Sequence, residues 1–323
     1  MKIFVTRKIP ESGLDLLSKK HELDINPYNR VLTKEEIIKG LHGKDGLICL
    51  LTDMIDKDII TSESKLKMIA NYAVGYNNID IETATKRGIP VSNTPGVLTD
   101  TTAEMAWALL FSAARRIAEG DKFTRSGRFI GWDPMLMLGQ DISDKTLGII
   151  GTGRIGTAIG LKSKGFNMDV LYVDKRKNEI LEHIVNASKV DIFTVLKKSD
   201  FVSIHVPLTE STYHMIGEKE LRMMKKNAIL INTSRGPIVD EQALIKALKE
   251  KWIFGAGLDV YEHEPHISGE LKKLNNVVLQ PHSASATIET RTKMAIMTAK
   301  NMLIGLKGKI PPNCVNKEVF ERK

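Results

Sequence analysis

The chain has 323 residues, of which 42% are hydrophobic and 27% are charged, proportions typical of soluble globular proteins. A single hydrophobic core seldom grows to this length, so we expect two domains. No apolar run approaches the roughly 20 residues that span a bilayer, which argues against a membrane protein.

The N-terminal segment and the cysteine content both bear on the cellular compartment. The first residues, "MKIFVTRKIP", have too short an apolar part for a signal peptide and are typical of a first strand. The two cysteines, Cys49 and Cys314, form no CxxC pair, so neither a disulfide framework nor a zinc ribbon is expected. These features predict a cytoplasmic protein.

The formal net charge of +8 raises the question of a nucleic-acid partner. The lysines occur as short pairs among acids, without a long basic block and with few interleaved aromatic residues. We therefore expect neither nucleic acid nor a membrane as partner, and interpret the charge as a solvated surface that attracts anionic substrates.

Strand-like apolar runs alternate with amphipathic segments from the N-terminus onward. The runs are "KIFVT", "HELDIN", "DGLICLL", "LKMIANY" and "IPVSN", and helix-like segments cover 11–20, 33–41, 56–62 and 80–87. Continuous β-branched runs indicate strands that are covered on both faces, as in parallel sheets. This alternation predicts an α/β fold.

The stretch 99–127 separates this series from a second one. Its apolar residues recur at helical spacing with no breaker before Gly120, so we predict one long, largely buried helix that links two domains. The second series of strands is "TLGIIG", "MDVLYV", "DFVSIHV", "AILINT", "IFGAGLDV" and "NVVLQP".

A last amphipathic helix is expected in "ATIETRTKMAIMTAKNMLIGLKG", and we expect it to return to the first domain. The predicted architecture is therefore two Rossmann-like or flavodoxin-like domains with parallel sheets. One domain is discontinuous, formed by 1–98 plus 287–323, and the other covers 99–286.

The second series begins with a glycine-rich turn between a strand and a helix. Gly151 permits a tight turn, Gly153 allows the backbone to approach a pyrophosphate, and Gly156 allows the helix to pack on the strand. The helix N-terminus then offers free N–H groups to the anion. The next strand ends in Asp174, where a carboxylate accepts hydrogen bonds from ribose hydroxyls. This pattern predicts dinucleotide binding.

Asp174 also bears on which dinucleotide is bound. A carboxylate at this position binds a free 2′-hydroxyl and repels a 2′-phosphate, which favours NAD. The cations Lys175, Arg176 and Lys177 follow directly, so use of NADP, alone or beside NAD, stays open.

Three polar groups follow later strands of the same series. Arg235 lies in "INTSRGPIVDEQAL", Glu264 in "LDVYEHEP" and His282 in "LQPHSASAT". Ligands of open parallel sheets bind at the carboxyl ends of the strands, so these groups form a candidate set downstream of the dinucleotide loop. The flanking His263 and His266 leave open a metal-dependent hydrolase, although we expect no metal.

The motifs above occur in the order found in a known family. With "NYAVGYNNIDIETATKRGIPVSNTPGVLTDTTAE" and "GWDPMLMLGQDISDKTLGIIG", they cover nearly the whole chain. The chain resembles the D-isomer-specific 2-hydroxyacid dehydrogenases, and among them the glyoxylate/hydroxypyruvate reductases. The resemblance implies an active site in the cleft between a substrate-binding domain, formed by 1–98 plus 287–323, and a dinucleotide-binding domain, formed by 99–286.

The resemblance assigns roles to the catalytic set. Arg235 would pair with the substrate carboxylate and contact the reactive carbonyl oxygen. His282 would donate a proton to that oxygen as hydride reaches C2, and Glu264 would hydrogen-bond the His282 ring and stabilise its protonated form.

The resemblance also implies the residues that surround the cofactor and substrate. The backbone of Val74 and Gly75 would bind the substrate carboxylate, and Leu51 and Thr52 would form a pocket wall. The implied cofactor-binding positions are Thr102, Gly151, Gly153, Arg154, Ile155, Gly156, Asp174, Val206, Pro207, Thr233, Asp259 and Ala284, with Asp259 facing the carboxamide.

Two positions depart from the commonest family pattern. Ala284 replaces a glycine in the segment after the catalytic histidine, and its methyl group would crowd the nicotinamide. Asp174 replaces the Ser-Arg ending of members that accept NADP, which again favours NAD.

Trp132 has two interpretations. It is either a buried or interface aromatic residue without a chemical role, or it reaches into the active site of a neighbouring subunit and limits substrate size. The second interpretation implies a homodimer that acts on small 2-keto acids.

Several alternatives remain at this stage. A short form of D-3-phosphoglycerate dehydrogenase and an NAD-sensing corepressor-like binding protein both keep the cofactor loop. Outside the catalytic set, His205 is interpreted as a packing residue. The histidines expected at the surface are His21, His42, His183 and His214.

Overall fold

The computed structural model describes residues 1–321. The chain forms two compact units. Unit 1 comprises Met1–Leu98 together with the C-terminal segment from Ala286, and unit 2 comprises Thr99–Ser285. Each unit contains one parallel sheet, as the strand–helix alternation predicted.

Unit 1 is built on a five-stranded sheet in the order β2-β1-β3-β4-β5. Its strands are β1 (Lys2–Val5), β2 (Glu22–Ile25), β3 (Gly46–Cys49), β4 (Met68–Asn71) and β5 (Val91–Ser92), and every pairing between them is parallel. Its helices are α1 (Glu11–Ser18), α2 (Lys34–Leu41), α3 (Lys57–Ser62), α4 (Ile81–Lys86) and α12 (Ile288–Gly305), with a 3₁₀ turn η4 (Lys317–Phe320).

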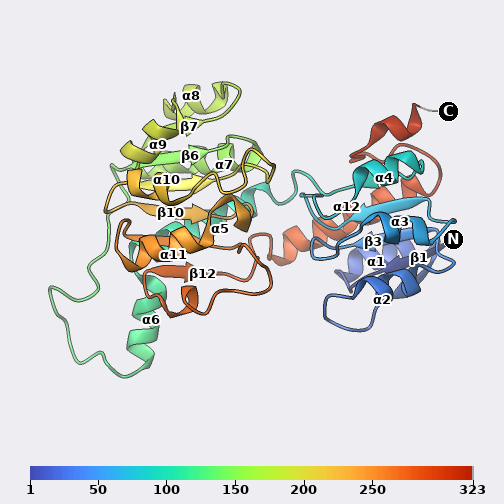
Figure 1. Ribbon diagram of the computed structural model, residues 1–323, viewed down its shortest axis with the longest axis horizontal. Helices are drawn as coiled ribbons and strands as arrows, with labels where there is room; N and C mark the ends of the chain where they lie inside the picture. Colours follow the sequence, from blue (N-terminus) through green and yellow to red (C-terminus); the bar gives the residue numbers. More distant parts are fainter. Residues whose placement is uncertain (322–323) are drawn as a thin grey trace. The chain divides into compact units, whose positions relative to one another are not determined.

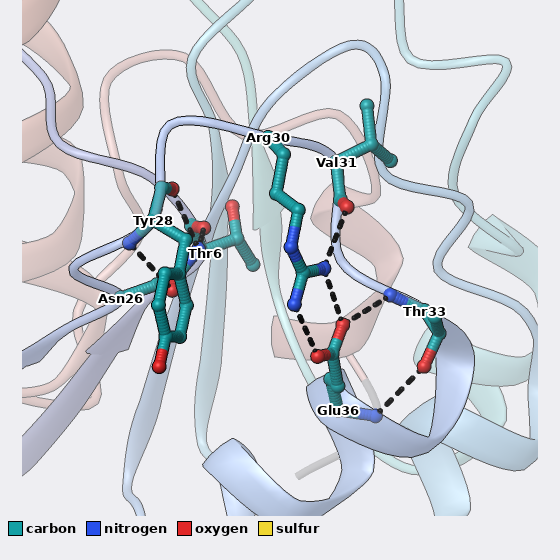
Figure 2. A network of polar contacts seen from close by, with 7 residues as sticks. All are labelled: Thr6, Asn26, Tyr28, Arg30, Val31, Thr33 and Glu36. Carbon is teal, nitrogen blue, oxygen red and sulfur yellow. Dashed lines mark hydrogen bonds and ion pairs between the residues drawn. The ribbon is translucent and has the colours of Figure 1, made fainter.

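Helices α2, α3, α4 and α12 of unit 1 begin at side-chain caps, whereas α1 begins at Pro10 without one. At α2, the Thr33 hydroxyl accepts a hydrogen bond from the Glu36 N–H, and the Glu36 carboxylate accepts one from the Thr33 N–H (Figure 2). Arg30 holds the same carboxylate with both of its terminal nitrogens. Asp56 and Asp80 cap α3 and α4 by accepting the N–H of Ile59 and of Thr83, without the reciprocal bond.

The C-terminal helix belongs to unit 1, as expected. Helix α12 packs against α1, where Gly13 lies so close that an added Cβ would come within 2.6 Å of the Ala295 carbonyl oxygen. The Tyr72 hydroxyl, just after β4, donates to the Arg291 carbonyl oxygen at 2.8 Å. The last helix of the chain therefore completes the first unit.

Unit 2 is built on a seven-stranded parallel sheet in the order β12-β11-β10-β9-β6-β7-β8 (Figure 1). Its strands are β6 (Thr146–Ile150), β7 (Asp169–Val173), β8 (Ser188–Lys189), β9 (Phe201–Ile204), β10 (Ile229–Asn232), β11 (Gly255–Leu258) and β12 (Val277–Leu279). Its helices are α5 (Thr99–Ala114), α6 (Ile117–Arg125), α7 (Arg154–Lys162), α8 (Glu179–Val185), α9 (Ile192–Lys198), α10 (Glu218–Met223) and α11 (Glu241–Lys249). Its 3₁₀ turns are η1 (Ser163–Phe166), η2 (Gly236–Ile238) and η3 (Leu271–Lys273).

Both faces of this sheet are buried, which explains its continuous apolar strands. Along β10, Ile229 and Ile231 belong to one hydrophobic cluster, while Leu230 between them belongs to the other. Helix α5 contributes to the first cluster, and helices α9, α10 and α11 contribute to the second. A strand so covered needs apolar residues at every position.

The single helix expected over 99–127 is wrong: the structure has two helices there. Helix α5 ends at Ala114, whose carbonyl oxygen accepts a hydrogen bond from the Gln140 N–H at 2.8 Å. Arg116 then adopts a left-handed conformation with φ of 54°, and its guanidinium binds Glu119. The Gln140 N–H thus occupies the carbonyl oxygen of Ala114, which a further helical turn would have used. The helix therefore ends there, although the apolar spacing of the sequence continues.

The connection between α6 and β6 leaves the body of unit 2 as a long loop (Figure 1). Several of its large apolar side chains are exposed, including Ile130 at 99% and Trp132 at 86%. Among residues 1–321, no helix is long and apolar enough to cross a bilayer.

Candidate active site

Glu264 and His282 come together beyond the ends of two neighbouring strands. Strands β11 and β12 pair in parallel with Leu258 opposite Leu279, so the loops that follow them start side by side. The His282 Nδ1 lies 2.8 Å from Glu264 Oε2. The other carboxylate oxygen, Oε1, accepts the Tyr261 N–H at 3.0 Å. One oxygen thus anchors the carboxylate while the second orients the imidazole through Nδ1.

Glu264 is held as a carboxylate by its partners. Burial acts to raise the pKa of this group, but the hydrogen bond and charge of His282, the Tyr261 N–H and the charge of Arg235 outweigh it. The pKa of Glu264 therefore lies below its ordinary value of 4.5.

Arg235 follows β10, the next strand of the sheet. Its position is set by backbone contacts: the Asn232 side-chain amide donates to the Arg235 carbonyl oxygen at 2.9 Å, and Arg235 Nη1 donates to the Ser234 carbonyl oxygen at 2.7 Å. Burial lowers the pKa of Arg235, and the charge of Glu264 opposes that shift. The guanidinium therefore belongs to the same electrostatic site as Glu264.

Gly236 brings the Arg235 loop against the Glu264 loop. A Cβ added to Gly236 would lie 1.9 Å from both the carbonyl carbon and oxygen of Tyr261 and 2.5 Å from the Glu262 nitrogen. No side chain fits there, so the glycine after Arg235 is required by a close approach of two backbones. This approach joins the loops that carry Arg235 and Glu264.

Asp259 organises the loop that carries His282. It is fully buried, and its two carboxylate oxygens accept the Ser283 N–H at 2.7 Å and the Ala284 N–H at 2.8 Å. Burial raises the pKa of Asp259, against the two backbone hydrogen bonds that lower it. The neighbouring His282 has φ of 53°, an unusual conformation for a residue other than glycine. Asp259 thus supports a strained turn that presents the histidine.

The glycine-rich turn has the geometry of a dinucleotide loop. Gly151 has φ of 92°, and a Cβ there would lie 2.7 Å from Val206 Cγ1; a Cβ on Gly156 would lie 2.0 Å from the Gly151 carbonyl oxygen. A Cβ on Gly153 would meet nothing within 4 Å. Packing therefore explains two of the glycines, while the third leaves space at the N-terminus of α7 that a pyrophosphate fits.

Asp174 lies at the end of β7 beside this turn. Its Oδ2 accepts the Thr152 N–H at 2.6 Å, and its Oδ1 accepts the Arg176 N–H at 3.2 Å. Burial acts to raise the pKa of Asp174, but these backbone hydrogen bonds prevail and the pKa is lowered. The carboxylate is ionised and only partly buried, as a ribose-binding group requires.

The remaining predicted cofactor positions lie near the same edge of the unit 2 sheet. Thr233, directly after β10, has a buried Oγ1 without a hydrogen-bond partner in the described part of the chain, so it offers an unused polar group. Val206 and Pro207 follow β9, and the buried Thr102 lies in the first turn of α5. Arg154 and Ile155 begin α7.

The predicted substrate positions of unit 1 follow two adjacent strands. Leu51 and Thr52 come after β3, and Val74 and Gly75 come after β4. The carbonyl oxygen of Val74 accepts the Asn93 amide and that of Gly75 accepts the Asn71 amide, each at 2.8 Å. The turn is thereby fixed, and the substrate contacts of these four residues stay predictions.

Trp132 lies in the long α6–β6 connection, where it is exposed within a single chain. The chain itself therefore gives this tryptophan no buried packing role, and its contribution to a neighbouring subunit stays a prediction.

His214, one of the histidines expected at the surface, is partly exposed and lies beside the loops that carry Arg235 and Glu264. His214 Nε2 is 2.7 Å from Glu262 Oε1, and the His214 N–H donates to the Pro237 carbonyl oxygen at 2.8 Å. The pairing with Glu262 was not predicted, because nothing in the local sequence "TYHMIG" indicates it. The sequence indicated only that a second acid, Glu262, lies two residues before Glu264. By contrast, His263 and His266 are exposed, and no group of three metal-binding side chains occurs among residues 1–321.

His205 occupies a second interior position, near Gly151. Its Nε2 lies 2.8 Å from the Ser203 hydroxyl, and burial lowers its pKa to about 3, so the ring is neutral. This agrees with its interpretation as a packing residue.

Comparison with known proteins identifies the family. Residues 107–284 match the model of the NAD binding domain of D-isomer specific 2-hydroxyacid dehydrogenases. The chain is 54% identical over 323 residues to a glyoxylate reductase of Thermococcus litoralis, covering 99% of this chain and 98% of that protein.

Solved structures agree over the same length. A protein of Thermus thermophilus is 40% identical with a TM-score of 0.93, covering 98% of this chain and all of the other. An NADPH-dependent glyoxylate/hydroxypyruvate reductase of Sinorhizobium meliloti, in complex with NADP and malonate, is 28% identical with a TM-score of 0.87, covering all of this chain and 98% of the other. The chain therefore belongs to the D-isomer-specific 2-hydroxyacid dehydrogenase family, in its glyoxylate reductase branch, and is an NAD(P)-dependent oxidoreductase.

Proposed function

We propose that the protein reduces a small 2-keto acid, glyoxylate or hydroxypyruvate, to the D-2-hydroxy acid with NADH. The observation that carries this proposal is the joining of Arg235, Glu264 and His282 at the carboxyl ends of three adjacent strands, downstream of the dinucleotide loop. The relatives named glyoxylate reductase support the choice of substrate.

Each side chain has a task in this reaction. Arg235 binds the substrate carboxylate and polarises the carbonyl oxygen, because its planar guanidinium can contact two oxygens at once. His282 donates a proton from Nε2 to that oxygen, while Nδ1 stays on Glu264. Glu264 sets the orientation of the ring. The bound nicotinamide supplies the hydride that reaches C2 of the substrate.

The dinucleotide is held by groups at the edge of the unit 2 sheet. The N–H groups at the start of α7 bind the pyrophosphate, with Gly153 leaving the room for it. Asp174 accepts hydrogen bonds from the ribose. Thr233, Val206 and Pro207 line the cofactor, as do Thr102 and Ala284.

We propose NADH as the preferred cofactor because the ionised Asp174 repels a 2′-phosphate. The structural relatives include complexes with NADPH and NADP, so the choice requires a direct test. The exposed cations Lys175, Arg176 and Lys177 are the groups that would support use of NADPH.

We also propose that the protein acts as a homodimer in which Trp132 limits the size of the substrate. Its exposure in one chain, beside the exposed Ile130, favours burial by a second copy. Deleting the indole in Trp132→Ala should then widen substrate acceptance.

A substrate panel tests the proposal. The purified protein is mixed with NADH or NADPH and with glyoxylate, hydroxypyruvate, pyruvate or phosphohydroxypyruvate, and oxidation of the cofactor is followed by its absorbance. We expect the highest kcat/KM for glyoxylate or hydroxypyruvate with NADH. A clear preference for phosphohydroxypyruvate would indicate a phosphoglycerate dehydrogenase, and no turnover across the panel would refute the reductase.

A further inference from the structure

A cavity lies in unit 2 at the amino ends of its strands, whereas Arg235, Glu264 and His282 follow the carboxyl ends. Its volume is about 1140 Å³, somewhat above the roughly 300–1,000 Å³ of typical small-molecule pockets, so a nucleotide-sized ligand has room there. Ile253 and Phe254 precede β11, Asn276 precedes β12, and Lys226 lies shortly before β10. Arg235, Glu264 and His282 follow the carboxyl ends of the same three strands. The cavity is therefore separate from the catalytic site.

The cavity is lined by an excess of positive charge. Seven of its lining residues are lysine or arginine and one is an acid, Glu119. Arg116 is paired with Glu119 and Lys249 with Glu270. The other five have no carboxylate within 4.0 Å in the described part of the chain: Lys122, Lys226, Lys251, Lys272 and Lys273.

Unpaired like charges around a hollow repel one another and concentrate the positive potential inside it. Elsewhere in the chain many lysines are matched with acids, as Lys34 is with Asp56 and Lys225 with Asp200. A bound anion of several charges would offset the repulsion at the cavity.

The kind of cation points to phosphate rather than carboxylate. Carboxylates are best bound by the fork of an arginine, and the one arginine at the cavity already gives its Nε and Nη2 to Glu119. Lysines bind phosphate as point charges. Five unpaired lysines carry five positive charges, which a ligand with more than one phosphate would balance better than a single phosphate.

The inner wall of the cavity is apolar. Phe254, Leu274 and Val278 line it with partly exposed apolar side chains, and the buried Ala113 and Val277 lie behind them. Such a wall suits an organic group and gives a purely inorganic anion nothing to contact. We propose that this cavity binds an organic polyphosphate of the nucleotide class, independently of the dinucleotide loop.

Calorimetric titration of the NADH-saturated protein tests the proposal, because saturation blocks the dinucleotide loop. ATP and inorganic tripolyphosphate are compared as probes, with citrate as a carboxylate anion. We expect ATP to bind more tightly than tripolyphosphate, because only ATP reaches the apolar wall, and we expect citrate to bind weakly. Tripolyphosphate binding as tight as ATP would assign the site to the inorganic anion and overturn the organic part of the proposal.

Charge reversal locates the site. The double variant Lys272→Glu/Lys273→Glu should weaken ATP binding by about tenfold or more, since it removes two charged contacts. The matched control is Lys197→Glu/Lys198→Glu, an exposed lysine pair at the end of α9 outside the cavity. It should leave ATP binding unchanged.

Three results would overturn the proposal. Equal loss of binding in both double variants would indicate unspecific attraction to a basic surface. Displacement of ATP by NADH would place ATP at the dinucleotide loop. Unchanged ATP binding together with an altered oligomeric mass in Lys272→Glu/Lys273→Glu would assign the cavity to contact with a second copy. Substrate turnover by the control and wild type is measured separately, so loss of the proposed reductase function is distinguished from loss of this site.

Discussion

His214 and Glu262 form a second histidine–acid pair beside that of His282 and Glu264, with 2.7 Å between Nε2 and Oε1. Glu262 Oε2 also accepts the Glu241 N–H at the start of α11. Through Pro237, the backbone of His214 contacts the loop of Arg235. The pair thus ties together the loops that carry Arg235 and Glu264.

We predict that His214→Ala lowers kcat about tenfold by loosening Glu264, with little effect on NADH affinity. The estimate follows from the loss of one charge-assisted hydrogen bond. The measurement is steady-state kinetics across pH. In a Glu264→Gln background the same substitution should have little further effect on kcat, and independent, additive effects would show that His214 acts elsewhere. His214→Gln, which keeps a donor, should recover part of the activity.

His282→Ala should lower kcat by a factor of about 10² to 10⁴, because the proton donor for the carbonyl oxygen is lost. NADH binding, measured by fluorescence titration, should stay near the wild-type value. Substantial residual turnover in this variant would mean that another group protonates the substrate.

Glu264→Gln should destabilise the protein in a pH-dependent way. The pKa of Glu264 is below its ordinary value of 4.5 in the folded chain, so its pairing with His282 adds to the free energy of unfolding above that pH. This contribution is lost as the pH falls through the lowered pKa. Urea unfolding of wild type and Glu264→Gln should therefore differ near neutral pH and converge in acid, and a constant difference would contradict the assignment.

Asp174 allows a test of cofactor choice that separates charge from packing. Asp174→Ala should weaken NADH binding about tenfold, since it removes charged hydrogen bonds to the ribose and also frees the Thr152 N–H. Asp174→Asn keeps an acceptor for Thr152 but loses the charge, so it should improve NADPH relative to NADH. An unchanged ratio of kcat/KM for the two cofactors would remove the reason for proposing NADH.

Gly236→Ala should reduce activity without touching a reacting group. A methyl group there would lie 1.9 Å from the Tyr261 peptide, so the loops of Arg235 and Glu264 must separate. We expect a higher KM for the keto acid together with a lower kcat. Gly269→Ala, on the same unit but with no atom near an added Cβ, is the matched control and should behave as wild type.

Much of the fold followed from the sequence because its strands are buried on both faces. An uninterrupted run such as "AILINT" leaves few alternatives, and β10 was found there. Strand β8 has only two residues, Ser188 and Lys189, and both are exposed. It contains no apolar run, so the sequence did not predict it. The break between α5 and α6 was missed because it depends on Gln140, whose N–H reaches Ala114 from a distant part of the chain.

In the candidate site, too, some residues could be predicted from the local sequence and others could not. Arg235, Glu264 and His282 each follow a recognisable strand, and the order of strands in the sheet makes them neighbours. The roles of Asp259 and His214 depend on contacts across 25 and 48 residues, which no local pattern encodes. Asp259 was expected to face the carboxamide of the cofactor. In the folded chain both of its carboxylate oxygens accept hydrogen bonds from the turn after His282. Its contact with the cofactor stays a prediction.

The return of α12 to unit 1 affects the order in which the chain folds during synthesis. Unit 2 is one continuous segment that ends at Ser285, whereas unit 1 needs α12, which packs on α1 and β4, to bury its core. The strands of unit 1 therefore emerge from the ribosome before unit 2, yet their domain is completed only after unit 2 has been synthesised. While unit 2 is synthesised, these strands have an unburied face, and an unprotected nascent chain of this kind is a target for chaperones.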